Sequence, residues 1–73
     1  MELRLIVTGS QTSAIKAKRH LEKGGIIAQV VRAPKYAEGC RFGIEILLSD
    51  LPHAIALLGE ARIEYTEILK SKT

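Results

Sequence analysis

The sequence is short of the residues that small extracellular and membrane proteins depend on. Its 73 residues include one cysteine, no tryptophan, one phenylalanine and two tyrosines. A single cysteine excludes an internal disulfide framework, so we expect a reducing, cytoplasmic location. No apolar run approaches the roughly 18 residues of a membrane span. The N-terminal residues also lack the basic and apolar regions of a signal peptide, so we expect no membrane partner.

What the chain does contain is typical of one small folded domain, which we expect to span residues 1–73. Hydrophobic residues make up 47% and charged residues 26% of the chain, and its core must be built from aliphatic side chains because aromatics are only 4%. A chain of this length buries a small core and has marginal stability. The net charge of +3 suits an acidic partner but is too small to indicate nucleic-acid binding.

Six segments carry the periodicity of regular structure. Alternating apolar residues over 3–8 predict a strand, and Ser10 or Thr12 can cap a helix that Gly24 and Gly25 end. A β-branched run over 26–32 and an alternating run over 41–48 predict two more strands. Pro52 fits the first turn of a second helix, whose apolar stripe runs to Ala61, and residues 63–69 predict the last strand.

The order strand, helix, strand, strand, helix, strand predicts an α+β fold. Its simplest arrangement is a ferredoxin-like βαββαβ two-layer sandwich, with a four-stranded antiparallel sheet and both helices on one face. We expect Leu3, Leu5 and Val7 to form the buried face of the first strand, and Phe42, Ile44 and Ile46 to face the helices.

This topology gives the lone cysteine, Cys40, a chemically distinctive position. The loop from Ala33 to Cys40 is expected at the same edge of the sheet as Ser10 and the N-terminus of the first helix, where unpaired amides favour negative charge. Arg41 and Lys35 add positive charge, and Gly39 permits a tight turn. Such surroundings stabilise a thiolate, which is the nucleophilic form of cysteine. A lone cysteine is also commonly a small buried side chain, so an inert Cys40 stays an alternative.

Several short motifs resemble a family of small bacterial and archaeal domains of unknown function described as Se/S carrier-like. The matching segments are Ala14-x-x-Ala17, Gly25-Ile26, Arg32 to Lys35, Gly39-Cys40 and Ile63-Glu64-Tyr65. The resemblance implies a ferredoxin-like fold and a carrier that holds a persulfide or perselenide on Cys40, passing it between donor and acceptor proteins. Arg41 follows the cysteine where the family often has glycine, and Arg62 replaces the usual glycine before the last strand.

Other functions have weaker support in the residues. No Cys–His pair or catalytic triad is recognisable, and His20 and His53 stand alone. We therefore expect a carrier or binding protein instead of an enzyme, without a metal or cofactor. One alternative is a regulatory protein-binding module that forms a homodimer through a sheet edge or the open face. A remote alternative is RNA binding, which needs Phe42 and Ile44 on the open sheet face for base stacking.

Overall fold

The computed structural model describes residues 2–32 and 41–70, and there the elements follow the predicted order. The first half consists of strand β1 (Leu3–Gly9), helix α1 (Gln11–Lys23) and strand β2 (Gln29–Arg32). The second half consists of strand β3 (Phe42–Leu47), the 3-10 helix η1 (Leu48–Asp50), helix α2 (Leu51–Glu60) and strand β4 (Glu67–Lys70).

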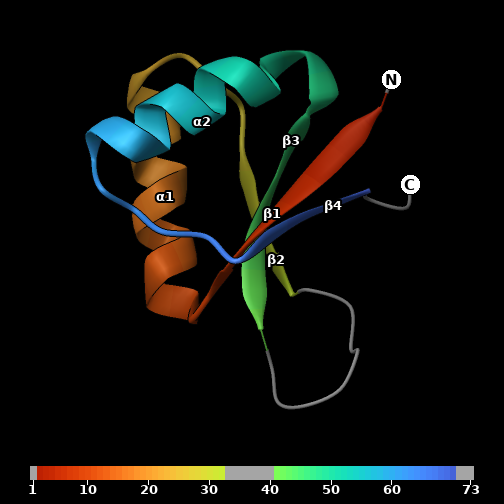
Figure 1. The fold of residues 1–73 in the computed structure, drawn as a ribbon, viewed down its shortest axis with the longest axis vertical. Helices are drawn as coiled ribbons and strands as arrows, with labels where there is room; N and C mark the ends of the chain where they lie inside the picture. The colour runs from red at the N-terminus through yellow and green to blue at the C-terminus, as the bar shows by residue number, and fades with distance from the viewer. Residues whose placement is uncertain (1, 33–40, 71–73) are drawn as a thin grey trace.

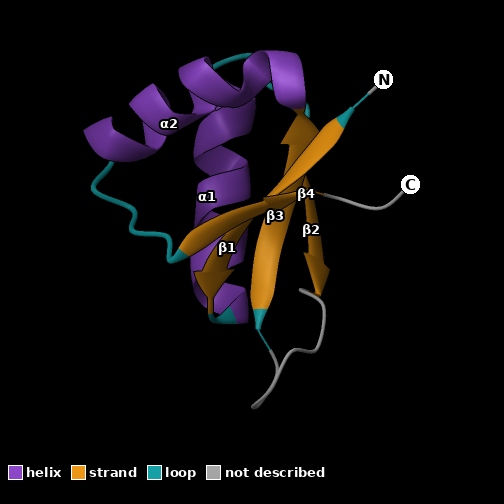
Figure 2. Cartoon of the chain, turned by 45° about the vertical axis from the view of Figure 1, so that its right-hand side comes forward, coloured by secondary structure: helices purple, strands orange, loops and turns teal. Residues whose placement is uncertain are grey.

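The strands form one antiparallel sheet in the order β2-β3-β1-β4 (Figure 1). Strands β1 and β2 are therefore parallel to each other, with β3 between them. Both helices lie on the same side of the sheet (Figure 2). This arrangement confirms the predicted ferredoxin-like α+β sandwich.

The main core lies between the helices and the sheet. Ala14, Ala17 and Leu21 supply the buried stripe of α1, as predicted, and Ala54 and Leu58 supply that of α2. They pack with sheet residues that include the buried Ile44 and Ile46, which confirms the predicted face of β3 for these two residues. Aliphatic burial of this kind is the dominant favourable term in folding.

The predicted face of β1 was wrong. Ile6 packs against the helices, whereas Leu5 and Val7 form a second cluster on the other side of the sheet. The three consecutive apolar residues are all buried because β1 is a central strand whose outer face is covered by the neighbouring side chains of Val31 and Leu69. A strand buried on both faces loses the alternation that distinguishes them.

Two predicted strands were too long. Of residues 26–32 only Gln29–Arg32 pair in the sheet, and of residues 63–69 only the part from Glu67 onward does, with Lys70 added. The amide of Ile26 donates to the carbonyl of Leu21 at 3.0 Å, and that of Ile63 donates to Leu58 at 2.9 Å. These apolar residues pack into the core from helix-ending turns instead of from a strand.

The two helix-ending turns have the same hydrogen-bond pattern. In each, the amide two residues beyond the helix cap reaches back to a carbonyl in the last turn, which is the Schellman motif. The motif requires a left-handed residue, which is Gly25 (φ 90°) after α1 but Arg62 (φ 56°) after α2. Arg62 is the only non-glycine residue with positive φ in the described part of the chain.

Candidate functional site at one end of the sheet

Four chain segments meet at the end of the sheet drawn lowest in Figure 1. Phe42, the first residue of β3, is in register with Gly9 at the end of β1 and with Arg32 at the end of β2. Helix α1 starts directly after Gly9 and Ser10, and Glu67 opposite Val7 brings the start of β4 to the same end. The predicted meeting of the end of β1, the start of α1 and the strand ends that flank residues 33–40 is therefore present, whereas the start of β4 was not predicted there.

The β1–β3 register shifts by one residue between Val7 and Gly9, next to the site. The hydroxyl of Thr8 donates to the carbonyl of Phe42 at 3.3 Å across the irregularity. A side chain at Gly43 would put its Cβ 2.5 Å from the carbonyl oxygen of Ile6, so only glycine fits there. Gly43 thus allows the close approach of β3 to β1.

Ser10 is the N-cap of α1, and this decides between the two predicted caps. Its Oγ accepts a hydrogen bond from the Ser13 amide at 3.1 Å, and its hydroxyl lies 3.1 Å from Ser13 Oγ. The Ser10 side chain is thus used by the helix itself. What this helix end offers to an anion is the backbone amides of its first turn, where there is no acidic residue.

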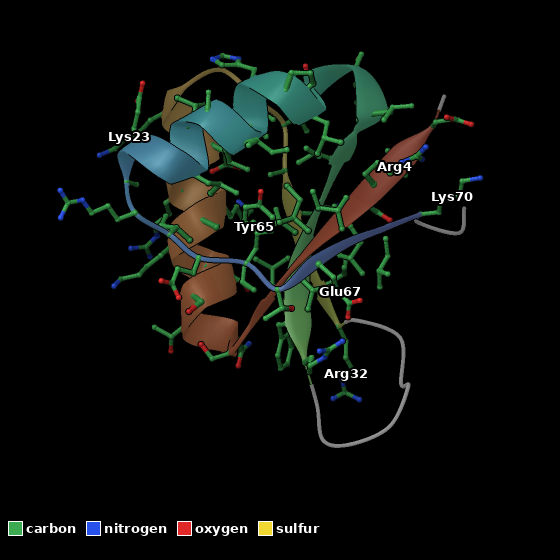
Figure 3. The ribbon with its side chains drawn as sticks, viewed as in Figure 1. Arg4, Lys23, Arg32, Tyr65, Glu67 and Lys70 are labelled. Atoms are coloured by element: carbon green, nitrogen blue, oxygen red, sulfur yellow. The ribbon has the colours of Figure 1, made fainter. Side chains whose placement is uncertain are left out.

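Arg41 lies at the same end and forms an ion pair with Glu67 at the start of β4. Both side chains are partly exposed, at 35% and 39%. Figure 3 shows Glu67 and Arg32 at this end of the sheet. Glu67 was not predicted as a partner of Arg41, because the two residues are 26 positions apart in the chain and only the β1–β4 register brings them together.

The pair has two consequences for an anion at this end. The carboxylate of Glu67 offsets part of the positive charge that Arg41 was expected to supply. A guanidinium nevertheless has five N–H donors, and the ion pair with Glu67 is made through one of its nitrogens, Nη2. Arg41 can therefore hold Glu67 and still donate to a second anionic group.

The other predicted site residues, Lys35, Gly39 and Cys40, lie outside the described residues. The described part ends at Arg32 and resumes at Arg41, the residue bonded to Cys40. Both flanking residues belong to the sheet end described above.

The arrangement needed for base stacking is absent from the described sheet. Ile44 is fully buried in the helix-facing core, so it is not on the open face. Phe42 lies two residues before Ile44 in the same strand, and residues two apart in a strand share a face. Within residues 2–32 and 41–70, no three His, Cys, Asp or Glu residues gather where they could hold a metal ion. No helix in the described ranges is long and apolar enough to cross a membrane.

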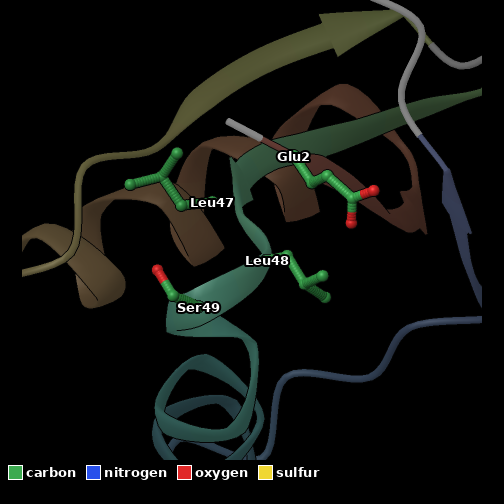
Figure 4. Close-up of a pocket in the computed structure, with 4 residues that line it drawn as sticks. All are labelled: Glu2, Leu47, Leu48 and Ser49. Atoms are coloured by element: carbon green, nitrogen blue, oxygen red, sulfur yellow. The ribbon is translucent and has the colours of Figure 1, made fainter.

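Two apolar hollows lie away from this end. One, of about 380 Å³, is lined by Glu2, Leu47, Leu48 and Ser49, where β3 passes into η1 (Figure 4). The other, of about 330 Å³, lies beside Leu3, Ile27 and Leu47. Among the described residues that line each hollow, the one carboxylate is Glu2 or Glu45 and no other side chain is titratable, so neither lining offers a general acid–base pair.

The described residues form a small α+β sandwich, and the only cysteine of the chain is the residue before Arg41 in the sequence. A family model described as "Putative Se/S carrier protein-like" matches residues 4–70. The chain therefore belongs to that family. No curated protein and no solved structure gives a significant match.

Proposed function

We propose that this protein carries sulfur or selenium as a persulfide or perselenide on Cys40. The family match over residues 4–70 supports a carrier, and Cys40 is the only thiol in the chain. The observation that carries the proposal is the position of Arg41. This cation adjoins Cys40 in the chain and lies, through the Phe42–Gly9 register, at the sheet end where α1 begins.

The proposed chemistry is a transfer between two sulfur atoms. The Cys40 thiolate attacks the outer sulfur of a donor protein's persulfide, R–S–SH. The donor S–S bond breaks, R–S⁻ leaves, and Cys40–S–SH forms, so the step needs no external oxidant or reductant. The same step in reverse direction loads an acceptor. A carrier of this kind requires an exposed nucleophile and no general base of its own.

Anion stabilisation is the contribution we assign to the surroundings. The amides of the first turn of α1 and the guanidinium of Arg41 favour negative charge. Lys35, through its positive charge, and Gly39, through the conformational freedom of glycine, are further contributors in this proposal. Donor and acceptor proteins are the partners that the function requires, and a reducing cytoplasm is the compartment that keeps a free thiol available.

Alkylation of the native protein tests the nucleophile. We expect Cys40 to react with iodoacetamide faster than a free-cysteine standard near neutral pH, because a larger fraction is thiolate. A rate equal to or below the standard, or reaction only after unfolding, would show an inert Cys40. That result favours the alternative of a protein-binding module.

Mass spectrometry of the intact chain tests the cargo. After exposure to a cysteine desulfurase and cysteine, we expect a mass increase of one sulfur atom that Cys40→Ser abolishes. A small-molecule persulfide, R–S–SH, is a second donor that transfers its outer sulfur to the Cys40 thiolate, releases R–S⁻ and needs no protein contact. Failure of both donors to load a reactive Cys40 contradicts the carrier function.

The ion pair at the sheet end supplies a matched pair of variants. We expect Arg41→Gln to slow alkylation of Cys40 severalfold because it removes the cation. Glu67→Gln should accelerate it, because it removes the competing carboxylate. Arg4→Gln is the control, since Arg4 pairs with Glu2 at the other end of β1. Equal rates in all three variants would show that Arg41 has no role in anion stabilisation.

A further inference from the structure

The positive charge of this protein is concentrated on one helix. Helix α1 contains Lys16, Lys18, Arg19 and Lys23 against the single acidic residue Glu22, which gives it a net charge of +3. The whole chain has 11 basic and 8 acidic residues, so 7 of each remain outside α1 and cancel. The formal charge of the molecule is thus the charge of this helix.

Three of these cations form an exposed row. Lys18 is bound to Glu22 at 2.7 Å, whereas Lys16, Arg19 and Lys23 are exposed and have no ion-pair partner in the described residues. Their spacing of three and four residues puts them on one face, spread over about 10 Å of helix. This face is opposite the buried stripe of Ala14, Ala17 and Leu21, and Lys23 projects away from the sheet (Figure 3).

A fourth cation, Arg62, extends this row. Arg62 and Lys16 line the same hollow of about 340 Å³, together with Thr8, Ser13 and Glu64. The turn after α2 holds the Arg62 backbone, through bonds from its own amide to Gly59 and from Ile63 to Leu58. The basic surface of this protein consists of Lys16, Arg19, Lys23 and Arg62.

We propose that the basic surface is a docking site for an acidic protein. Because charges across an interface are complementary, the partner's contacting surface should be negatively charged. A protein fits better than a nucleic acid, because four cations are few for a phosphate backbone and α1 has no Phe, Tyr or Trp to stack on a base. The exposed Ile15 beside the row offers an apolar contact that a protein partner can bury. A lipid surface is disfavoured because the apolar stripe of α1 is used by the core.

The docking site goes beyond sulfur carriage and does not depend on Cys40. Its test is binding of fluorescently labelled poly-L-glutamate, measured by anisotropy at low ionic strength. We expect Lys16→Gln combined with Arg19→Gln to weaken binding about three- to tenfold. Glutamine keeps the helix propensity of the original residues, so the fold should be retained.

The matched control removes the same charge elsewhere. Arg32→Gln combined with Lys70→Gln also lowers the net charge by two and should leave the affinity within about twofold of the wild type. Equal losses in the two double variants would overturn the proposal, because net charge alone would then explain binding. Tighter binding of polyuridylic acid or phosphatidylserine vesicles at the same ionic strength would also overturn it.

Cys40→Ser separates this proposal from the carrier function. We expect the Cys40→Ser chain to bind poly-L-glutamate as the wild type does, although it cannot be loaded with sulfur. Loss of binding in this variant would contradict a surface that is independent of the thiol. A wild-type chain that loads sulfur but does not bind the acidic polypeptide would overturn the docking site alone.

Discussion

At the scale of single residues, backbone conformation decides where this sequence accepts substitution. Arg62 adopts a left-handed conformation that costs residues with a Cβ roughly 1 kcal/mol. The turn after α2 holds Arg62 in this conformation, because it lets the amides of Arg62 and Ile63 donate to the carbonyls of Gly59 and Leu58. This agrees with the resemblance, in which a glycine is usual at this position.

We therefore predict that Arg62→Gly raises the free energy of unfolding. The expected gain is about 0.5–1 kcal/mol, since release of the left-handed strain outweighs the greater freedom of glycine in the unfolded chain. Urea denaturation measures it, with Arg62→Ala as the control that removes the charge but retains the Cβ. An alanine variant as stable as the glycine variant would contradict this explanation.

Gly43 and Gly59 form a contrasting pair. An added Cβ at Gly43 would meet the backbone of Ile6 at 2.5 Å, whereas one at Gly59, in α2, has nothing within 4 Å. We predict that Gly43→Ala lowers the free energy of unfolding by about 1–3 kcal/mol and that Gly59→Ala leaves it unchanged or raises it by up to about 1 kcal/mol. Urea denaturation of both variants checks the difference. A tolerant Gly43 would mean that β1 and β3 can separate at the irregularity.

At the scale of elements, Ser10 links the start of α1 to the proposed site. As a cap it stabilises the helix, and as a neutral residue it leaves the positive end of the helix dipole available to an anion. These two contributions can be separated because aspartate also caps helices but carries a negative charge.

We predict that Ser10→Ala lowers the free energy of unfolding by about 1 kcal/mol, because the bond to the Ser13 amide is lost. Ser10→Asp should keep the stability of the wild type but slow alkylation of Cys40 severalfold. Denaturation and alkylation rates on the same two variants test both effects. An unchanged alkylation rate in the aspartate variant would separate this helix end from the chemistry of Cys40.

At the scale of the whole molecule, stability rests on a small aliphatic core. Leu58 is fully buried between α2 and the sheet, whereas Ile27 is 80% exposed although it is equally apolar. A domain of this size has little stability in reserve, so the loss of one core side chain should be felt throughout the fold.

We predict that Leu58→Ala lowers the free energy of unfolding by about 2–5 kcal/mol and shifts or abolishes the cooperative transition. Ile27→Ala should change it by less than about 0.5 kcal/mol. Circular dichroism during thermal unfolding measures both. Similar effects of the two substitutions would contradict the location of the core between the helices and the sheet.

One part of the candidate site was predicted from the sequence and another part was not. The sequence predicted that Ser10 and Arg41 lie at one end of the sheet, because strand order and handed connections leave few alternatives for a βαββαβ chain. It did not predict the Arg41–Glu67 pair, because two strands that are distant in sequence meet in a register that no local pattern encodes.

The order of elements, the buried stripe of α1 and the end of α1 at Gly24 and Gly25 follow from the sequence alone, since all of these depend on neighbours within a few residues. The sequence also singled out Cys40 as the one thiol. Which side of β1 faces the helices depends on tertiary packing, because Leu5, Ile6 and Val7 are all apolar and burial on both faces comes from neighbouring strands. Strands β2 and β4 begin later than the sequence pattern predicts, because the amides of Ile26 and Ile63 bond to the ends of the preceding helices instead of to the sheet.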